Sequence, residues 1–254
     1  MLAQKLKNLR YKSLSLKRKF LDPILQQAGA DIIHVIGDSH STLFQYIAHN
    51  FIWINTCFEF CIVQGATAIG LANPHSKTQA FNVYNNYIRS IPKNQKKVHL
   101  LFCLGEVDCG FVIWYRAQKY NVPIETQFQL SLSNYLNFID SANSQGFNKI
   151  LVCSTPLPTI LENQNWGEVA NNRRKYVKAT LYERTNLTMK YNSQLQSHCK
   201  RKGYDFIDLE SQILNKSKNI IGNKFRNQNP LDHHLNSTTV SPLLIKALKQ
   251  RGYW

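Results

Sequence analysis

The sequence predicts a three-layer α/β/α sandwich built on a mostly parallel sheet. Apolar runs of strand length recur along the chain and alternate with segments of helical periodicity. These runs are apolar throughout, which indicates strands buried on both faces and covered by helices. A chain of 254 residues is also long enough to bury roughly 70–75% of its unfolded surface, so it needs no disulfide or metal to hold one large domain together.

The first half of the chain contains three predicted strands and two predicted helices. The strands are apolar and all three end on glycine, whereas the helices carry apolar residues on one side. In chain order they are strand 31–37, helix 41–51, strand 58–65, helix 76–91 and strand 97–105.

The second half continues the alternation of helix and strand. The predicted elements are helix 129–146, strand 149–158 running into a proline-rich loop, helix 171–202, strand 204–210 and helix 241–252. We expect Ser241 to be the N-cap of the last helix and Pro242 its first helical residue.

Residues 1–30 form a basic N-terminal extension, and residues 31–254 form the α/β/α domain. The extension holds seven Lys or Arg residues and one acidic residue. Its apolar spacing could make an amphipathic helix that contacts a membrane surface peripherally. The favoured interpretation is a helical extension packed on the domain.

The formal net charge of +16 indicates either a solvated basic surface or an anionic partner, such as an acidic glycan, the phosphates of a nucleotide or of coenzyme A, or a membrane surface. The sequence has no named nucleic-acid-binding motif, so nucleic acid is not the expected partner. We expect an anionic or carbohydrate substrate.

The location and cofactor content follow from what the sequence lacks. It has no apolar run of about 18 residues and no signal-peptide pattern, which predicts a cytoplasmic protein. It has six cysteines but no C-x-x-C pair, so we expect neither a structural zinc site nor another cofactor.

Polar side chains gather where the predicted strands end. In open α/β sheets, ligands bind outside the carboxyl ends of the strands. The segments at these ends are Gly37-Asp38-Ser39-His40, Gly65-Ala66-Thr67, Gly105-Glu106-Val107-Asp108 and Ser154-Thr155-Pro156. To these we add the loop before the last helix, which contains Asp232, His233 and His234.

The residue types at these ends suit nucleophilic catalysis. A serine hydroxyl needs a base to take its proton, and the base needs an orienting acid. Ser39 follows the first strand, and Asp232 could hold His234 within one loop. Backbone N–H groups near Ser39 and at Gly65 could stabilise an oxyanion. Asp38 and Ser41 could instead be ordinary helix caps.

These blocks, in this order, resemble the SGNH/GDSL hydrolase superfamily. The matching segments are "GDSHS", the glycine after the second strand, "LGEVD" and "DHHLN". The resemblance implies a flavodoxin-like sheet and ester hydrolysis or acyl transfer. It assigns Ser39 as the nucleophile, His234 as the base, Asp232 as its orienting acid, and the Ser39 and Gly65 backbones as oxyanion donors.

The sequence departs from the family pattern in two places. The family has an asparagine that donates to the oxyanion where this chain has Val107, and an ionised carboxylate beside it can only accept hydrogen bonds. The family's acid and base are spaced D-x-x-H, whereas here they read D-H-H. His233 is therefore the alternative base.

Two further interpretations remain open at this stage. Asp38, His40, Glu106, Asp108 and the two late histidines could be ligands in a metallophosphoesterase-like two-metal site, although the G-N-H and G-H-x-H blocks of that family are absent. Alternatively, the domain has lost hydrolysis and binds or transfers glycan, nucleotide-sugar or acyl-CoA groups.

The favoured prediction is a serine esterase that acts on an O-acyl group, most simply O-acetyl, of a carbohydrate. In it, the supporting residues at the strand ends bind substrate or stabilise the oxyanion. They are Asp38, His40, Gly65, Glu106, Asp108 and His233.

Overall fold

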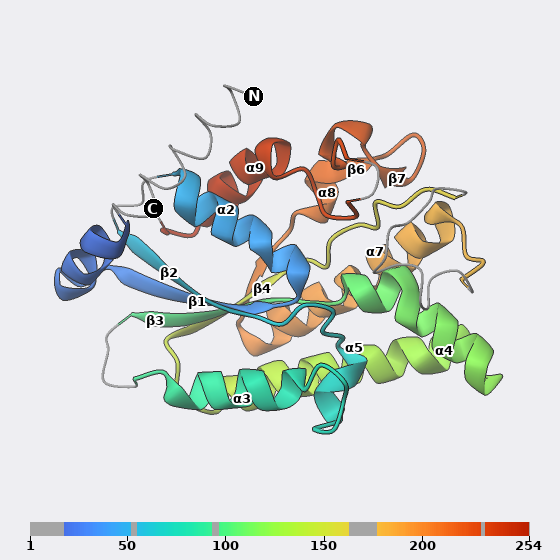
Figure 1. Cartoon of the computed structure of the whole chain (residues 1–254), viewed down its shortest axis with the longest axis horizontal. Helices are drawn as coiled ribbons and strands as arrows, with labels where there is room; N and C mark the ends of the chain where they lie inside the picture. Colours follow the sequence, from blue (N-terminus) through green and yellow to red (C-terminus); the bar gives the residue numbers. More distant parts are fainter. Residues whose placement is uncertain (1–17, 52–54, 93–96, 163–176, 230–231, 254) are drawn as a thin grey trace.

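The computed structural model describes residues 18–51, 55–92, 97–162, 177–229 and 232–253. Its centre is a five-stranded sheet in the order β2-β1-β3-β4-β5, in which every neighbouring pair is parallel (Figure 1). The strands are β1 (Asp31–Gly37), β2 (Thr56–Ile62), β3 (Val98–Cys103), β4 (Lys149–Cys153) and β5 (Asp205–Ile207).

Helices cover both faces of the sheet, which confirms the predicted α/β/α sandwich. One core packs α3 (Ala80–Ser90), α5 (Ile124–Asn143) and α7 (Leu181–Lys202) against one face. The other core packs α2 (Thr42–Asn50) and α9 (Ser237–Lys249) against the opposite face (Figure 1).

The alternation of side chains along the central strands divides them between the two cores. In β3, Leu100 and Phe102 face the α3–α5 side, whereas Leu101 and Cys103 face the α2–α9 side. Alternate side chains of a strand thus enter opposite cores. Because both faces are buried, nearly every position is apolar and the strands appear in the sequence as continuous hydrophobic runs.

Shorter elements complete the described chain. They are η1 (Ser39–Ser41), η2 (Ile69–Ala72), the π-helical turn η3 (Asp108–Val112), α4 (Ile113–Tyr120), α8 (Glu210–Ile213), the hairpin strands β6 (Leu214–Asn215) and β7 (Ile220–Ile221), and η5 (Asn223–Phe225). Residues 18–27 are helical and lie within the basic N-terminal extension; residues 1–17 are outside the described part.

Four predicted helix starts differ from the structure: α3 begins at Ala80 rather than at 76, α5 begins at Ile124 rather than at 129, and capping explains the other two. The long helix α7 begins at Leu181, because Thr180 and Glu183 form a capping box there; residues 177–180 are not helical, and 171–176 are outside the described residues. The last helix begins at Ser237, where the Asn236 side chain accepts a hydrogen bond from the backbone N–H of Thr238.

The earlier start of α9 places Pro242 inside the helix. Ser241 is therefore not its N-cap, and the helix lacks the backbone hydrogen bond that Pro242 cannot donate. Among the described residues, no helix combines the length and apolar character needed to cross a membrane. All six cysteines are buried and free.

Candidate active site

Three of the segments singled out in the sequence follow adjacent parallel strands. Gly37 at the end of β1 pairs with Ile62 of β2 and with Cys103 of β3. The segment that begins at Asp38, the turn at Gly65 and the segment that begins at Gly105 therefore leave the same edge of the sheet. Gly37 is required there, because a Cβ atom would lie 2.2 Å from the carbonyl oxygen of Cys103.

The turn that carries Ser39 is held by its neighbours. Asp38 Oδ1 accepts a hydrogen bond from the backbone N–H of His40 at 2.9 Å, and Ser41 Oγ donates to the Cys103 carbonyl at 3.2 Å. Asp38, His40 and Ser41 are buried, whereas Ser39 between them is partly exposed. Ser39 is thus the residue of this turn that a ligand can reach.

Asp38 caps the turn, which is the structural role that its residue type allows. It is 1% exposed, and burial raises the pKa of its carboxyl to about 7, against the opposing effect of His40. Its second oxygen, Oδ2, has no hydrogen-bond partner among the described residues.

The structure joins Asp232 and His234 within one loop. His234 Nδ1 lies 2.6 Å from Asp232 Oδ1, which also accepts the backbone N–H of His234 at 2.9 Å. Asn227 donates to the other oxygen of Asp232 at 2.7 Å. The short D-H-H spacing therefore still allows the acid to orient the imidazole, because a carboxylate favours the tautomer with its proton on Nδ1.

The surroundings of His234 favour the neutral form of its imidazole, which can act as a base. Burial lowers the pKa of its imidazole and the nearby His40 lowers it further, against the raising effect of Asp232. Its Nε2 atom is buried and has no hydrogen-bond partner among the described residues. A hydrogen bond from Ser39 Oγ to this nitrogen is accordingly not formed in this conformation; such bonds are often long before substrate binds.

Glu106 and His40 form a second acid–histidine pair. His40 Nε2 lies 2.9 Å from Glu106 Oε2, and both side chains are almost completely buried. Burial lowers the pKa of His40, but Glu106, through its charge and its hydrogen bond, together with smaller contributions from Asp38 and Cys103, raises the pKa to about 9. His40 is thus a buried cation at neutral pH, directly after Ser39 in the chain.

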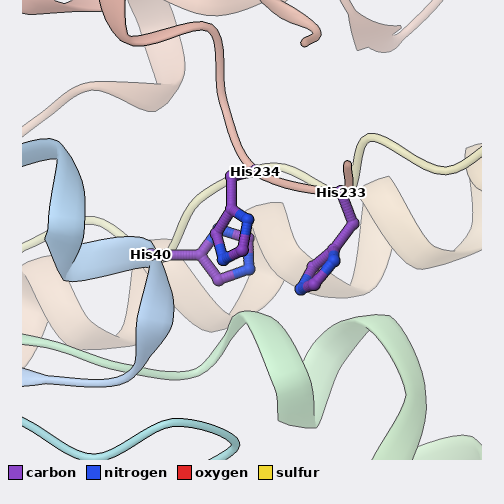
Figure 2. A group of neighbouring side chains, drawn as sticks. All are labelled: His40, His233 and His234. Atoms are coloured by element: carbon purple, nitrogen blue, oxygen red, sulfur yellow. The ribbon is translucent and has the colours of Figure 1, made fainter. Parts of the chain in front are cut away.

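Three imidazole rings connect the two pairs (Figure 2). The ring centroid of His40 lies 4.8 Å from that of His234 and 5.4 Å from that of His233, and the two late histidines are 4.3 Å apart. The loop is fixed by Thr159 Oγ1, which donates to the carbonyl of His233 at 2.6 Å. The fold thereby brings the Ser39 turn, Glu106 and the late loop into one cluster.

Asp108 lies in the same block as Glu106 but has a different environment. Its carboxylate accepts hydrogen bonds from the backbone N–H groups of Ala68 and Ile69, at 2.7 and 3.0 Å, and from Ser131 Oγ at 3.0 Å. It is fully buried, and burial raises its pKa to about 6. We assign Asp108 a positioning role, because these bonds fix the segment after Gly65.

A groove of about 460 Å³ starts at Gly65 and runs along α4. Its lining includes Lys77, Arg116, Lys119, Tyr115 and Tyr120, and no lining residue is acidic. Sequence reasoning missed this groove. The signal was present in the run "WYRAQKY", which places cations and aromatic rings on a short helix, but nothing in the sequence connects that helix to the strand ends.

No protein-family model matches the sequence, and no curated protein matches it. Among solved structures, the fold is similar to a member of the lipolytic protein G-D-S-L family from Veillonella parvula, with 14% identity, 87% of this chain and 97% of that chain covered, and a TM-score of 0.52.

It is also similar to a GDSL-like lipase from Bacteroides thetaiotaomicron, with 11% identity, coverage of 95% and 98%, and a TM-score of 0.52. The chain therefore has the fold of the SGNH/GDSL hydrolase superfamily.

Proposed function

We propose that the protein is a serine esterase that removes an O-acyl group, most simply O-acetyl, from an acidic carbohydrate. The observation that carries the proposal is the Asp232–His234 pair, whose 2.6 Å contact leaves His234 Nε2 buried and without a described partner. The ring lies beside His40, the residue that follows Ser39.

In the proposed reaction, Ser39 Oγ attacks the ester carbonyl while its proton passes to His234 Nε2. Asp232 stabilises the imidazolium that forms. The tetrahedral intermediate collapses as His234 returns the proton to the departing sugar hydroxyl, leaving an acyl group on Ser39. Water, activated by His234, then hydrolyses this acyl-enzyme and restores the serine.

The oxyanion would be stabilised by the backbone N–H groups of Ser39 and Gly65 and by the charge of His40. Val107 supplies no side-chain donor, and one such donor typically lowers a barrier by about 2.7–4 kcal/mol. Glu106 would oppose a developing negative charge if it stood alone. Its contact with His40 neutralises it, which favours hydrolysis at this site.

The groove at Gly65 supports an acidic glycan as the substrate. Three cations and no acid line it, and two of these cations lie over tyrosine rings, Arg116 over Tyr120 and Lys119 over Tyr115 and Tyr120. The net charge of +16 acts in the same direction by attracting anions to the surface. We therefore place the acyl-bearing residue of the glycan near Ser39 and its anionic neighbours in the groove.

One observation favours a second function, in which the same site binds or transfers glycan, nucleotide-sugar or acyl-CoA groups without hydrolysis. Val107 is half-buried at the start of the π-helical turn, at the position from which the family's asparagine donates. A site short of one oxyanion donor could hold an ester without efficient attack by water.

The test is turnover of chromogenic acetyl and butyryl esters by the wild-type chain, Ser39→Ala and, as a matched control, Ser193→Ala on the exposed face of α7. We expect turnover by the wild type and the control and a loss in Ser39→Ala. Arg116→Gln and Lys119→Gln should raise KM for an O-acetylated acidic glycan without affecting the small esters.

If the wild type turns over no ester while it binds acidic glycans through Arg116 and Lys119, the second function replaces the first. If the wild type needs added Mn²⁺ or Zn²⁺ and EDTA abolishes turnover, the serine mechanism is wrong.

A further inference from the structure

The three histidines of the cluster have the arrangement of a metal-binding site. One nitrogen from each of His40, His233 and His234 can be chosen such that the three atoms lie within 4.8 Å of one another. They come from two segments far apart in the sequence, and Figure 2 shows the His233 ring beside the neighbouring rings of His40 and His234. Imidazole nitrogens are ligands suited to zinc and related transition metals.

Each of two carboxylates contacts one nitrogen of a ring and leaves the other nitrogen as the candidate ligand atom. Glu106 lies against Nε2 of His40, which leaves its Nδ1, and Asp232 lies against Nδ1 of His234, which leaves its Nε2. Both remaining nitrogens are buried without hydrogen-bond partners among the described residues. Histidine ligands typically donate their other ring N–H to a carboxylate, which fixes the ring and increases its basicity as a ligand.

The carboxylates beside the three imidazoles also favour the binding of a divalent cation. A divalent ion in a buried site is costly unless negative charge lies close by. Glu106 and Asp232 would supply two carboxylates just outside the three imidazoles, and the ion would replace the proton that His40 otherwise carries.

The geometry needs a small adjustment. Tetrahedral zinc with Zn–N bonds of about 2.0–2.1 Å places its ligand atoms roughly 3.4 Å apart, so the nitrogens must move together. His233 is only partly buried, and a movement of its ring toward the other two would supply this adjustment.

We propose that His40, His233 and His234 bind one divalent transition-metal ion of the zinc class, with Glu106 and Asp232 as the carboxylates that orient two of the ligands. This proposal differs from the two-metal phosphoesterase considered from the sequence, because its ligands are three imidazoles and Asp108 takes no part. Three protein ligands leave a fourth position for water or a substrate oxygen.

A consequence follows if the proposed esterase function is correct. The metal would occupy the lone pair of His234 Nε2, which the reaction uses to take the proton from Ser39. Zinc binding and ester turnover would then exclude each other, and EDTA would restore turnover to the zinc-treated protein.

The test is titration of the metal-free full-length chain with Zn²⁺ by calorimetry and with Co²⁺ by visible absorption. We expect one equivalent of zinc and the intense d–d bands of a four-coordinate Co²⁺ site. His233→Gln and His234→Gln should weaken zinc binding at least tenfold, and Asp232→Asn about 10–100-fold. The matched control, His75→Gln, changes an exposed histidine outside the cluster and should bind as the wild type does.

Circular dichroism of each variant establishes that it is folded before titration. Absence of stoichiometric zinc binding by the wild type would overturn the proposal, as would equal loss of affinity in His75→Gln and in the cluster variants. The titration is repeated on Ser39→Ala, which should bind zinc normally whether or not the protein is an esterase.

Discussion

The two acid–histidine pairs at the strand ends contain the same chemical groups but have opposite properties. The Glu106–His40 pair is almost completely buried, and the carboxylate raises the pKa of His40 to about 9. The Asp232–His234 pair is partly exposed, and the pKa of His234 is lowered. Burial lowers the pKa in both histidines, so the difference arises from the charged neighbours.

The opposite shifts in pKa determine which of the two histidines can act as a base. His40 holds its proton at neutral pH and is a fixed cation, whereas His234 is neutral and keeps an available nitrogen. The first pair also acts on the second, since the charge of His40 helps to lower the pKa of His234. A protonated neighbour thus keeps the base unprotonated to lower pH.

The largest effect is expected from the second pair. His234→Ala should lower ester turnover by about 10³–10⁶-fold, as Ser39→Ala should, because triad members act as a unit. Steady-state kinetics of the two single variants and the double variant measure this, and the double variant should be little worse than either single one. If His233→Ala is the damaging change and His234→Ala is mild, the base is assigned to the wrong histidine.

A substitution in the Glu106–His40 pair should have a smaller effect on turnover and should change its dependence on pH. Glu106→Gln should leave His40 neutral, because burial then acts on its pKa without the carboxylate. The effect of His40 on His234 exceeds that of Glu106, so loss of both charges should raise the pKa of His234. The acid limb of the kcat/KM profile should move to higher pH, since turnover is lost once His234 is protonated.

The profile is measured between pH 4 and 9 with a neutral ester. Because the proposed stabilisation of the oxyanion by the charge of His40 is lost as well, turnover near pH 8 should fall by up to about 10²–10³-fold, the loss typical of one oxyanion donor. A limb that stays in place or moves to lower pH contradicts the electrostatic link between the pairs. Complete loss of turnover at every pH would place Glu106 in the catalytic machinery itself.

A substitution at Asp108 tests whether the pKa of His234 depends only on an acid that contacts a histidine. Asp108→Asn replaces an acceptor of three hydrogen bonds with a group that can accept at only one atom. It should lower the free energy of unfolding by about 1–3 kcal/mol, read from urea denaturation, without moving the acid limb as Glu106→Gln does. An equal shift of the limb in both variants would mean that any buried charge nearby sets the pKa of His234.

The smallest effect is expected at Val107. Val107→Asn should add a neutral donor beside the site and raise turnover of small activated esters by up to about tenfold, a fraction of what an established oxyanion donor contributes. Stopped assays with an acetyl ester measure it. Unchanged or lower turnover would show that the charge of His40 already fills this role or that the new side chain cannot reach the oxyanion.

Sequence reasoning could place the strand ends, because buried strands read as apolar runs and parallel strands end at one edge. It identified Ser39, Asp232 and His234 as candidates through their residue types and order. Helix starts were less accessible: the capping box at Thr180 and Glu183 lies inside a long polar run with no apolar boundary.

The partnerships within the site were beyond sequence reasoning. Glu106 and Asp108 are two residues apart, yet one contacts His40 and the other fixes residues 68 and 69. These different contacts coincide with the π-helical turn that begins at Asp108, and no hydrophobic periodicity in the sequence predicts such a turn. The pairing of His40 with the late loop likewise depends on contacts between residues nearly two hundred positions apart.

The central claim is that Ser39 becomes nucleophilic through His234, and covalent labelling tests it most directly. The full-length chain is treated with a fluorophosphonate at pH 8, digested, and analysed by mass spectrometry. We expect one adduct, on the peptide that contains Ser39. The adduct should be absent from Ser39→Ala and present in Ser193→Ala. In His234→Ala the rate of labelling should fall by orders of magnitude. Absence of an adduct on Ser39 in the wild type, or equal labelling of the wild type and His234→Ala, would contradict it.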